Sequence, residues 1–219
     1  LFKECVKNSG ILPLIQDGTI QKEIEASRIN RDREIATRKA TLVGTNQYPN
    51  VNEKMDEWIQ KEVSPKEVAL PLYREAATFE EIRLTTETFT KKSHRPKVFL
   101  LKIGNLAFRQ ARAGFTTNFF GCAGFEILDN AGFDTVQEGV AAALENNADI
   151  VVICSSDEEY ATLGIEATTL LKNTKTQTIV VVAGNPVDSI DSLKQTGVDD
   201  FIHVRTNILD SLKAFQTQL

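Results

Sequence analysis

The second half of the sequence predicts a doubly wound α/β fold built on one five-stranded parallel sheet. Five short apolar runs follow Pro96, and each of them is followed by a helical pattern. The runs lack the polar alternation of a strand with one solvated face, so both faces of every strand are expected to be covered. Because crossovers between parallel strands are right-handed, a flavodoxin-like arrangement is expected for residues 97–219.

Residues 1–50 are expected to form helices that end in turns. Gly18 and Thr19 interrupt the first helical stretch. The next stretch, Ile20–Lys39, is dense in charge and contains neither proline nor glycine, which predicts an exposed helix. Thr41–Thr45 predicts a short β-like run, and Asn46–Asn52 predicts a turn-rich loop. Since the chain opens on Leu-Phe-Lys without a methionine, we expect it to be part of a longer protein.

Residues 51–96 predict a linker that contains one helix. The stretch Val51–Pro71 mixes charges and prolines without a sustained period. Thr78 and Glu81 have the spacing of a capping box, in which a hydroxyl and a carboxylate satisfy backbone donors reciprocally. The helix behind them is expected to end before Pro96, because proline disfavours helical geometry in the residue that precedes it. The inward face of this helix is expected to hold Phe79, Ile82 and Phe89.

The alternating elements beyond Pro96 are predicted from apolar runs and from apolar residues at helical spacing. Strands are expected at Val98–Ile103, Gly124–Leu128, Ile150–Cys154, Ile179–Ala183 and Phe201–Val204. The first helix is expected to carry Phe108, Ala111, Phe115 and Phe119, and the last to carry Ile208, Leu212 and Phe215. The three helices between them are expected to span Val136–Asn147, Tyr160–Lys172 and Ser189–Gln195.

Composition and charge exclude several classes of function. With 42% hydrophobic and 25% charged residues the chain is an ordinary globular protein, and no apolar run approaches the roughly 20 residues of a membrane helix. The formal net charge is −5 and basic residues are interspersed with acidic ones, so nucleic acid is not an expected partner. Three cysteines in 219 residues form neither a disulfide framework nor a zinc site, which favours a reducing, cytoplasmic location.

Ligands of such a sheet bind outside the carboxyl ends of the strands, so the residues of the loops that follow the strands limit what can bind. A dinucleotide site needs G-x-G-x-x-G after the first strand, but Gly104 is the only glycine there. A phosphate-accepting receiver domain needs acidic residues after the first strand, an aspartate ending the third and a lysine ending the fifth. Those three places hold Gly104-Asn105, Cys154-Ser155 and Val204-Arg205. The phosphate loop of flavodoxin, rich in serine, threonine and glycine, is also missing.

Four passages along the chain have a recognisable order and spacing. They are Ala40-Thr-Leu-Val-Gly-Thr-Asn-Gln-Tyr-Pro, Thr78-Phe-Glu-Glu-Ile-Arg, Arg95-Pro-Lys-Val-Phe-Leu and Ala123-Gly-Phe-Glu-Ile. In this order the passages resemble the cobalamin-dependent mutases, in particular methylmalonyl-CoA mutase chains, over essentially the whole sequence. The resemblance implies that residues 1–50 are the C-terminal end of a truncated TIM barrel, residues 51–96 a linker, and residues 97–219 a cobalamin-binding-type domain.

The motif that binds cobalt in this family is expected to be lost. Catalytic members carry D-x-H-x-x-G after the first strand, where the histidine ligates cobalt and the aspartate fixes the histidine tautomer. When the sequence is counted back from Gly124-Phe-Glu-Ile, these three positions fall on Ala107, Arg109 and Arg112. An arginine guanidinium stays protonated at neutral pH and has no lone pair to donate, so Arg109 is excluded as a cobalt ligand.

The loops that line the family's slot for the nucleotide tail of cobalamin have also changed. The changed positions are Ser155, Ser156 and Asp157 after the third strand, and His203-Val-Arg205-Thr206 after the fifth. Bulky Phe108 and Arg205 are expected to fill the slot. His203 and His94 lack partners at ligand spacing, so we expect a structural role for the first, a surface position for the second, and no metal site.

The resemblance implies a structural role rather than a catalytic one. In the two-chain bacterial mutases a homologous small subunit without cobalamin pairs with a catalytic large subunit, and the holoenzyme is an isomerase of succinyl-CoA and methylmalonyl-CoA. We therefore expect no catalytic residue and no cofactor in this chain, with adenosylcobalamin bound by the partner. The alternative is a binding module that retains a corrinoid, or an acyl-CoA or anion site at Arg109 and Arg112 near a helix N-terminus.

Overall fold

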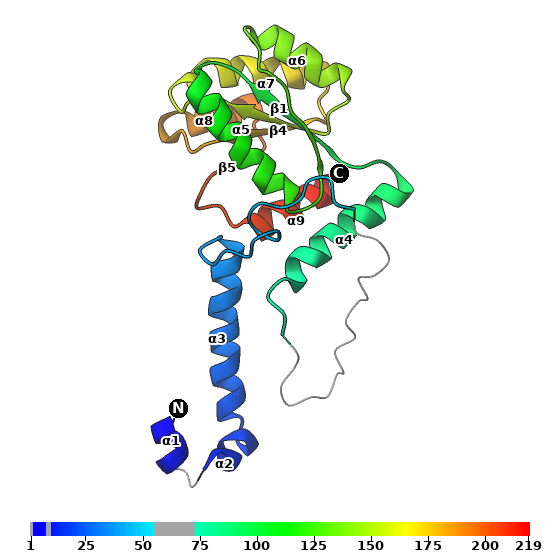
Figure 1. The fold of residues 1–219 in the computed structure, drawn as a ribbon. Helices are drawn as coiled ribbons and strands as arrows, with labels where there is room; N and C mark the ends of the chain where they lie inside the picture. Colours follow the sequence, from blue (N-terminus) through cyan, green and yellow to red (C-terminus); the bar gives the residue numbers. More distant parts are fainter. Residues whose placement is uncertain (1, 8–9, 55–72) are drawn as a thin grey trace.

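The computed structural model describes residues 2–7, 10–54 and 73–219. The described chain opens with α1 (Phe2–Lys7), α2 (Ile11–Gln16) and α3 (Thr19–Ala36). Helix α3 extends away from the α/β part of the molecule (Figure 1), and most of its side chains are exposed. Gly18 precedes α3 with a left-handed φ of 81°, a conformation that glycine adopts without strain. The predicted break and the predicted exposed helix are therefore confirmed.

Residues 97–219 form a five-stranded parallel sheet in the order β2-β1-β3-β4-β5. The strands are β1 (Lys97–Lys102), β2 (Glu126–Leu128), β3 (Ile150–Cys154), β4 (Ile179–Ala183) and β5 (Asp200–Ile202). The register places Phe99 opposite Val151 in the β1–β3 ladder and Val152 opposite Val181 in the β3–β4 ladder. This doubly wound, flavodoxin-like sheet confirms the predicted fold class.

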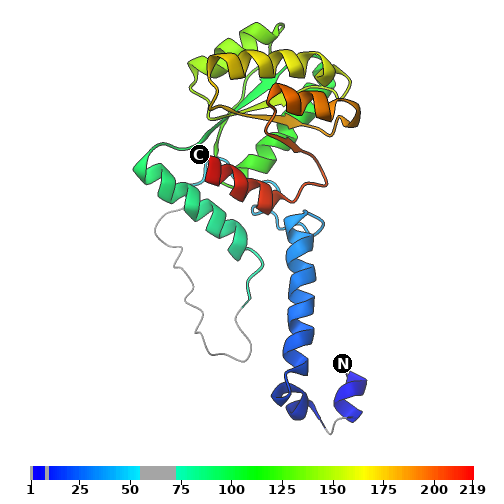
Figure 2. The ribbon, with the colours of Figure 1, turned by 180° about the vertical axis from the view of Figure 1, so that it is seen from behind.

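Helices cover both faces of the sheet (Figures 1 and 2). They are α5 (Leu106–Gly121), α6 (Val136–Glu145), α7 (Leu163–Thr174), α8 (Ile190–Thr196) and α9 (Ile208–Gln218), with the short 3-10 turns η1 (Glu159–Ala161) and η2 (Val187–Ser189). Side chains of α5 and α9 pack with one set of strand residues, and side chains of α6, α7 and α8 pack with the alternate set. Buried strands with two covered faces explain why the apolar runs show no polar alternation.

Polar side chains fix where three of these helices begin. Asn105 caps α5 by accepting hydrogen bonds from the backbone N–H groups of Ala107 and Phe108. Thr135 and Glu138 form a reciprocal capping box on α6. Asn207 caps α9 in the same way as Asn105 caps α5. Each cap satisfies donors that the first turn of a helix leaves without an intrahelical partner.

Two local predictions before the sheet are wrong. Thr41–Thr45 forms a turn with an isolated bridge between Val43 and Gln47 instead of a strand. Buried Asn46 holds this turn, because its side chain accepts from Leu42 N at 2.7 Å and donates to two backbone carbonyls. The capping box at Thr78 is also wrong, because the helix already begins at Ala77 and its N-cap, Ala76, makes no side-chain hydrogen bond.

Two predictions inside the α/β part need correction, and packing sets the inward face of α5. The helix expected at Tyr160–Lys172 begins as η1, and regular α-helix starts at Leu163. The last strand ends at Ile202, and the chain turns at the residues that follow. Helix α5 does not bury Phe108 or Ala111. Its inward face consists of Ala113, Thr116, Phe119 and Phe120.

Helix α4 (Ala77–Lys92) precedes the sheet in sequence and packs into its core. Phe79 and Ile82 are fully buried in the same cluster as Leu100 of β1 and Phe215 of α9. The helix ends four residues before Pro96, as the sequence predicts. Most of the predicted linker Val51–Pro71 lies outside the described residues.

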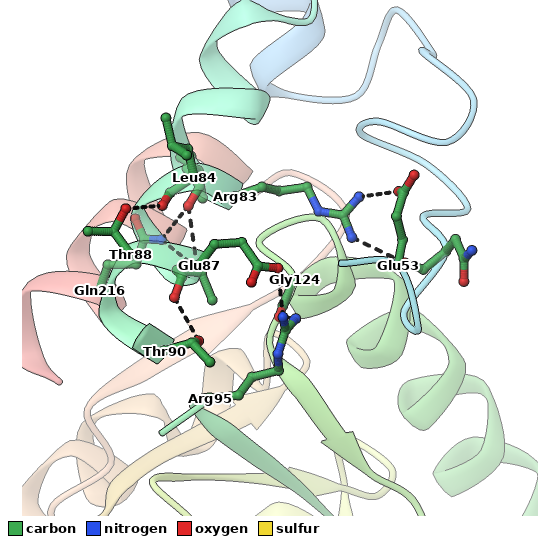
Figure 3. A network of polar contacts seen from close by, with 12 residues as sticks. Glu53, Arg83, Leu84, Glu87, Thr88, Thr90, Arg95, Gly124 and Gln216 are labelled. Carbon is green, nitrogen blue, oxygen red and sulfur yellow. Dashed lines mark hydrogen bonds and ion pairs between the residues drawn. The ribbon is translucent and has the colours of Figure 1, made fainter. Parts of the chain in front are cut away.

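Two arginines tie α4 to distant parts of the chain (Figure 3). Buried Arg83 donates to Glu53 Oε2 at 2.7 Å and to a backbone carbonyl of the preceding loop at 3.1 Å. Arg95 donates to Glu87 Oε1 and to the carbonyl of Gly124, both at 2.6 Å. We call these five residues the α4 brace. The brace joins residues before α4, the helix itself and the α5–β2 turn.

Two of the three cysteines are small core residues, whereas Cys5 is only partly buried. Cys122 and Cys154 are fully buried, and burial raises the pKa of each thiol to about 12. Within residues 2–7, 10–54 and 73–219 no helix combines the length and the apolar character that crossing a membrane requires.

Candidate functional site: the carboxyl edge of the sheet

A carboxylate of the chain itself lies between the carboxyl ends of β1 and β3. Both oxygens of Glu159 accept from the backbone N–H of Asn105 at 3.1 Å. Glu159 Oε2 also accepts from Ser155 Oγ at 2.6 Å and from the N and Oγ atoms of Ser156 at 3.2 and 2.9 Å. We call these two backbone N–H groups and two hydroxyls the Glu159 cradle. The donors that a ligand could use here are engaged by an internal side chain.

The cradle stabilises the ionised form of Glu159. Partial burial on its own would raise the pKa of this carboxyl group. The hydrogen bonds from Ser155, Asn105 and Ser156 oppose this effect and together lower the pKa from 4.5 to about 2. Glu159 is therefore a carboxylate throughout the physiological pH range.

Gly104 allows the backbone after β1 to approach the carboxylate. Its φ of 76° lies in the left-handed region that favours glycine. A Cβ atom at this position would lie 2.6 Å from Ser155 Oγ and would also collide with the Glu159 carboxylate. Glycine is therefore required here by both the backbone conformation and the close contact.

Tyr160 closes the neighbouring space between β3 and β4. Its side chain is fully buried, and its hydroxyl donates to the carbonyl of Ala183 at 2.7 Å and accepts from the backbone N–H of Ser155 at 3.0 Å. Burial raises the pKa of this phenol well above its usual range. The Tyr160 ring thus occupies space at the strand ends, and its hydroxyl satisfies backbone groups there.

Arg112 and Asp157 form an ion pair across the same edge. Arg112 Nη2 donates to Asp157 Oδ1 at 2.9 Å, and both side chains are partly exposed. Gly184 follows β4, and a Cβ atom there would lie 2.6 Å from Asp157 Oδ1 and 2.9 Å from the Tyr160 ring. The structure therefore brings together four of the residues singled out in the sequence, namely Arg112, Ser155, Ser156 and Asp157.

Arg109 lies apart from this group, against the loop between β2 and α6. Its Nη1 donates to the carbonyl of Phe133 at 3.3 Å, and a Cβ atom at Gly132 would lie 2.9 Å from its Cζ. Its Nε is buried without a hydrogen-bond partner among the described residues. Ala107, the third position at which the sequence predicts a changed cobalt motif, is exposed in the first turn of α5.

The expectation that Phe108 and Arg205 fill the edge is wrong. Phe108 is 51% exposed on the first turn of α5, and Arg205 is exposed in the turn after β5. Glu159 and Tyr160 close the edge instead. His203 lies beside Arg205, whose backbone N–H donates to His203 Nδ1 at 3.2 Å.

No group of three or more histidine, cysteine, aspartate or glutamate side chains in the described part of the chain is placed to hold a metal ion. His94 bonds to Asp149 at 2.9 Å and is about half exposed, near the amino end of β1.

Sequence reasoning missed the two residues that close the edge, Glu159 and Tyr160. A usable signal was present, because Ser156-x-x-Glu159 has the spacing of a capping box. The structure shows both bonds of that box, from Ser156 N to Glu159 Oε2 at 3.2 Å and from Glu159 N to Ser156 Oγ at 3.4 Å. No comparable pattern marks Tyr160, whose hydroxyl lies within hydrogen-bond distance of the carbonyls of Ile153 in β3 and Ala183 in β4.

The side chains at this edge do not fit a cobalamin site. A lower ligand to cobalt must donate a lone pair, and the guanidinium of Arg109 has none to give. The space beside Gly104 is occupied by Glu159, and the space beside Gly184 is occupied by Asp157 and Tyr160. Fold and edge together define the α/β part as a flavodoxin-like domain of the cobalamin-binding type with a closed edge.

Comparison with known proteins identifies the family. The sequence profile described as methylmalonyl-CoA mutase matches residues 1–91. The chain is 41% identical to the methylmalonyl-CoA mutase small subunit of Porphyromonas gingivalis over 98% of its length, and 25% identical to that of Streptomyces virginiae over 96%. It is 26% identical to the methylmalonyl-CoA mutase of Rhizobium meliloti over 58% of its length, which is 18% of that relative. The chain belongs to the methylmalonyl-CoA mutase family.

The chain spans about a third of the length of the small subunits that it matches, 35% of the first and 34% of the second. The family match at residues 1–91 covers α1 to α3 and almost all of α4. Similarity to the small subunits extends further, through the α/β part.

Proposed function

We propose that this chain belongs to a non-catalytic small subunit of an adenosylcobalamin-dependent methylmalonyl-CoA mutase. In this role it binds and stabilises the catalytic large subunit, and the holoenzyme interconverts succinyl-CoA and methylmalonyl-CoA. Adenosylcobalamin is held by the large subunit alone. The three thiols are free, which agrees with a reducing compartment such as the cytoplasm.

The closed edge is the observation that supports this proposal. The Glu159 cradle and Tyr160 occupy the carboxyl ends of β1, β3 and β4, where a sheet of this type binds its ligands. The buried framework of two apolar layers is complete around them. A domain that keeps its framework while its ligand edge is filled is suited to binding a protein partner rather than a cofactor.

Mixing the chain with a catalytic large subunit tests the proposal. Size-exclusion chromatography with light scattering should show a 1:1 complex, and the large subunit should lose activity more slowly on heating in that complex. A flavodoxin-like domain from an unrelated protein, added at equal concentration, is the control. Two separate peaks and an unchanged inactivation rate would contradict the proposal.

The second candidate is an acyl-CoA or anion site at Arg109 and Arg112. The unpartnered Nε of Arg109 favours it, whereas the ion pair of Arg112 with Asp157 opposes it. Calorimetric titration with coenzyme A distinguishes the two functions. Saturable binding that disappears in Arg109→Met would support the anion site, and the absence of heat would exclude it.

A further inference from the structure

We infer that the carboxyl edge contains a binding site for a small carboxylate, which Glu159 of the same chain occupies as a built-in ligand. The cradle stays closed to external carboxylates as long as Glu159 is in place. The site goes beyond the proposed function and concerns this chain alone.

The four donors of the cradle converge on one carboxylate, all of them reaching Glu159 Oε2, and the N–H of Asn105 reaches Oε1 as well. The two backbone N–H groups come from different loops, at Asn105 after β1 and at Ser156 after β3. The hydroxyls of Ser155 and Ser156 add charge-assisted bonds at 2.6 and 2.9 Å. Four donors that converge on one anionic group resemble a recognition site more than a chance surface contact.

The surrounding backbone is shaped to admit the carboxylate. Gly104 brings the chain so close that any side chain there would overlap both the carboxylate and the Ser155 hydroxyl. Its left-handed φ of 76° presents the next backbone N–H, that of Asn105, to the two carboxylate oxygens. Asn105 is exposed, so the cradle borders solvent.

The tether explains why the site stays closed. A carboxylate held within the same chain acts at an effective concentration in the millimolar range or above, so dilute external anions do not displace it. Glu158, the adjacent acidic residue, is exposed and shows no hydrogen bond or ion pair within the described part of the chain. Only Glu159 is in register with the cradle, which makes Glu158 a matched control position.

Chemical rescue of Glu159→Ala tests the inference. This variant removes the carboxylate and leaves space beside the four donors. Its Tm should be lower than that of the unmodified chain and should rise saturably with sodium formate, beyond the effect of sodium chloride at equal ionic strength. The Tm of Glu158→Ala and of the unmodified chain should show no such formate-specific rise.

NMR spectra of the backbone amides test binding at the cradle directly. If Glu159 had only a structural role, formate would not shift these resonances. In Glu159→Ala, formate should shift the amide resonances of Asn105 and Ser156, and in Glu159→Gln it should not, because the amide side chain still fills the space. If Glu159→Ala is unfolded at room temperature, the recovery of folded protein on refolding should increase with formate concentration.

Three outcomes would overturn the inference. They are a formate effect equal to that of chloride, an equal effect on Glu158→Ala, or a larger rise in Tm with phosphate than with formate. None of these measurements involves the large subunit or cobalamin, so their outcome is independent of the proposed function.

Discussion

The Glu159 cradle and the α4 brace are two polar networks of similar chemistry that connect different parts of the chain. The partners in the cradle lie at the carboxyl ends of two adjacent strands, β1 and β3. The partners in the brace come from the loop before α4, from α4 and Arg95, and from the α5–β2 turn (Figure 3). The cradle fills the carboxyl edge of the sheet, whereas the brace joins segments of the chain that share one folded core.

This difference separates the framework of the domain from its carboxyl edge. The brace and the apolar layers hold the framework of the domain together, and the cradle holds only the loops at its carboxyl edge. Substitutions in the brace should therefore lower the global stability of the chain. Substitutions in the cradle should mainly affect the carboxyl edge. The following predictions test that separation, from the largest expected effect to the smallest.

Phe79→Ala should have the largest effect, because Phe79 anchors α4 in the core beneath the brace. It is fully buried, and its truncation should lower the free energy of unfolding by about 3–5 kcal/mol. Phe108→Ala is the matched control on an exposed aromatic residue, with an expected change within about 0.5 kcal/mol. Urea unfolding followed by circular dichroism measures both variants. A small effect at Phe79 would show that α4 is not part of the common core.

Arg95→Ala should have the next largest effect, since it removes two charge-assisted bonds of the brace. Arg95 and Glu87 are only 16% and 13% exposed, so we expect a loss of about 2–3 kcal/mol. Arg28→Ala removes a comparable pair with Glu25 on the surface, where the side chains are 42% and 48% exposed. There the expected change in unfolding free energy is about 0–1 kcal/mol. Equal losses in the two variants would remove the distinction between brace and surface pairs.

Gly104→Ala should destabilise the edge by about 1–3 kcal/mol, because the new Cβ is strained and overlaps the cradle. Gly114→Ala is a control of opposite sign. Gly114 lies within α5, and a Cβ atom there would have no neighbouring atom within 4 Å, so alanine should stabilise by about 0.5–1 kcal/mol. Thermal unfolding of both variants measures the difference. Stabilisation by both substitutions would contradict the close approach at Gly104.

The pH dependence of Glu159→Gln should give the smallest effect, because Glu159 is only partly buried and solvent screens its interactions. The pKa of Glu159 is about 2 when folded and 4.5 in the ordinary carboxyl group, so the ionised form stabilises the native state above about pH 4.5. That stabilisation is lost as the pH falls through 4.5 toward 2. The difference in unfolding free energy between the chain and the variant should be constant near neutral pH and shrink over this interval. A difference that does not change with pH would contradict a lowered pKa.

The sequence contained enough information to predict the framework. Apolar runs such as Ile150–Cys154 and Ile179–Ala183 match β3 and β4 residue for residue, because strands buried on both faces must be continuously apolar. The end of α4 before Pro96 followed from proline geometry in the same way. Errors arose where side chains override local propensity, as with Asn46, whose bonds convert a β-like run into a turn.

The edge was predictable only in part. That Arg109 cannot ligate cobalt is visible in the residue type alone, because a guanidinium has no lone pair to donate. The closure by Glu159 and Tyr160 is not, because it depends on the approach of Asn105 and Ala183 from other strands.

Titration with adenosylcobalamin, followed by its visible spectrum and by equilibrium dialysis, tests the closed edge most directly. We predict no saturable binding to this chain and no spectral change toward a histidine-ligated form. Tight, saturable binding of adenosylcobalamin by the unmodified chain would contradict the closed edge.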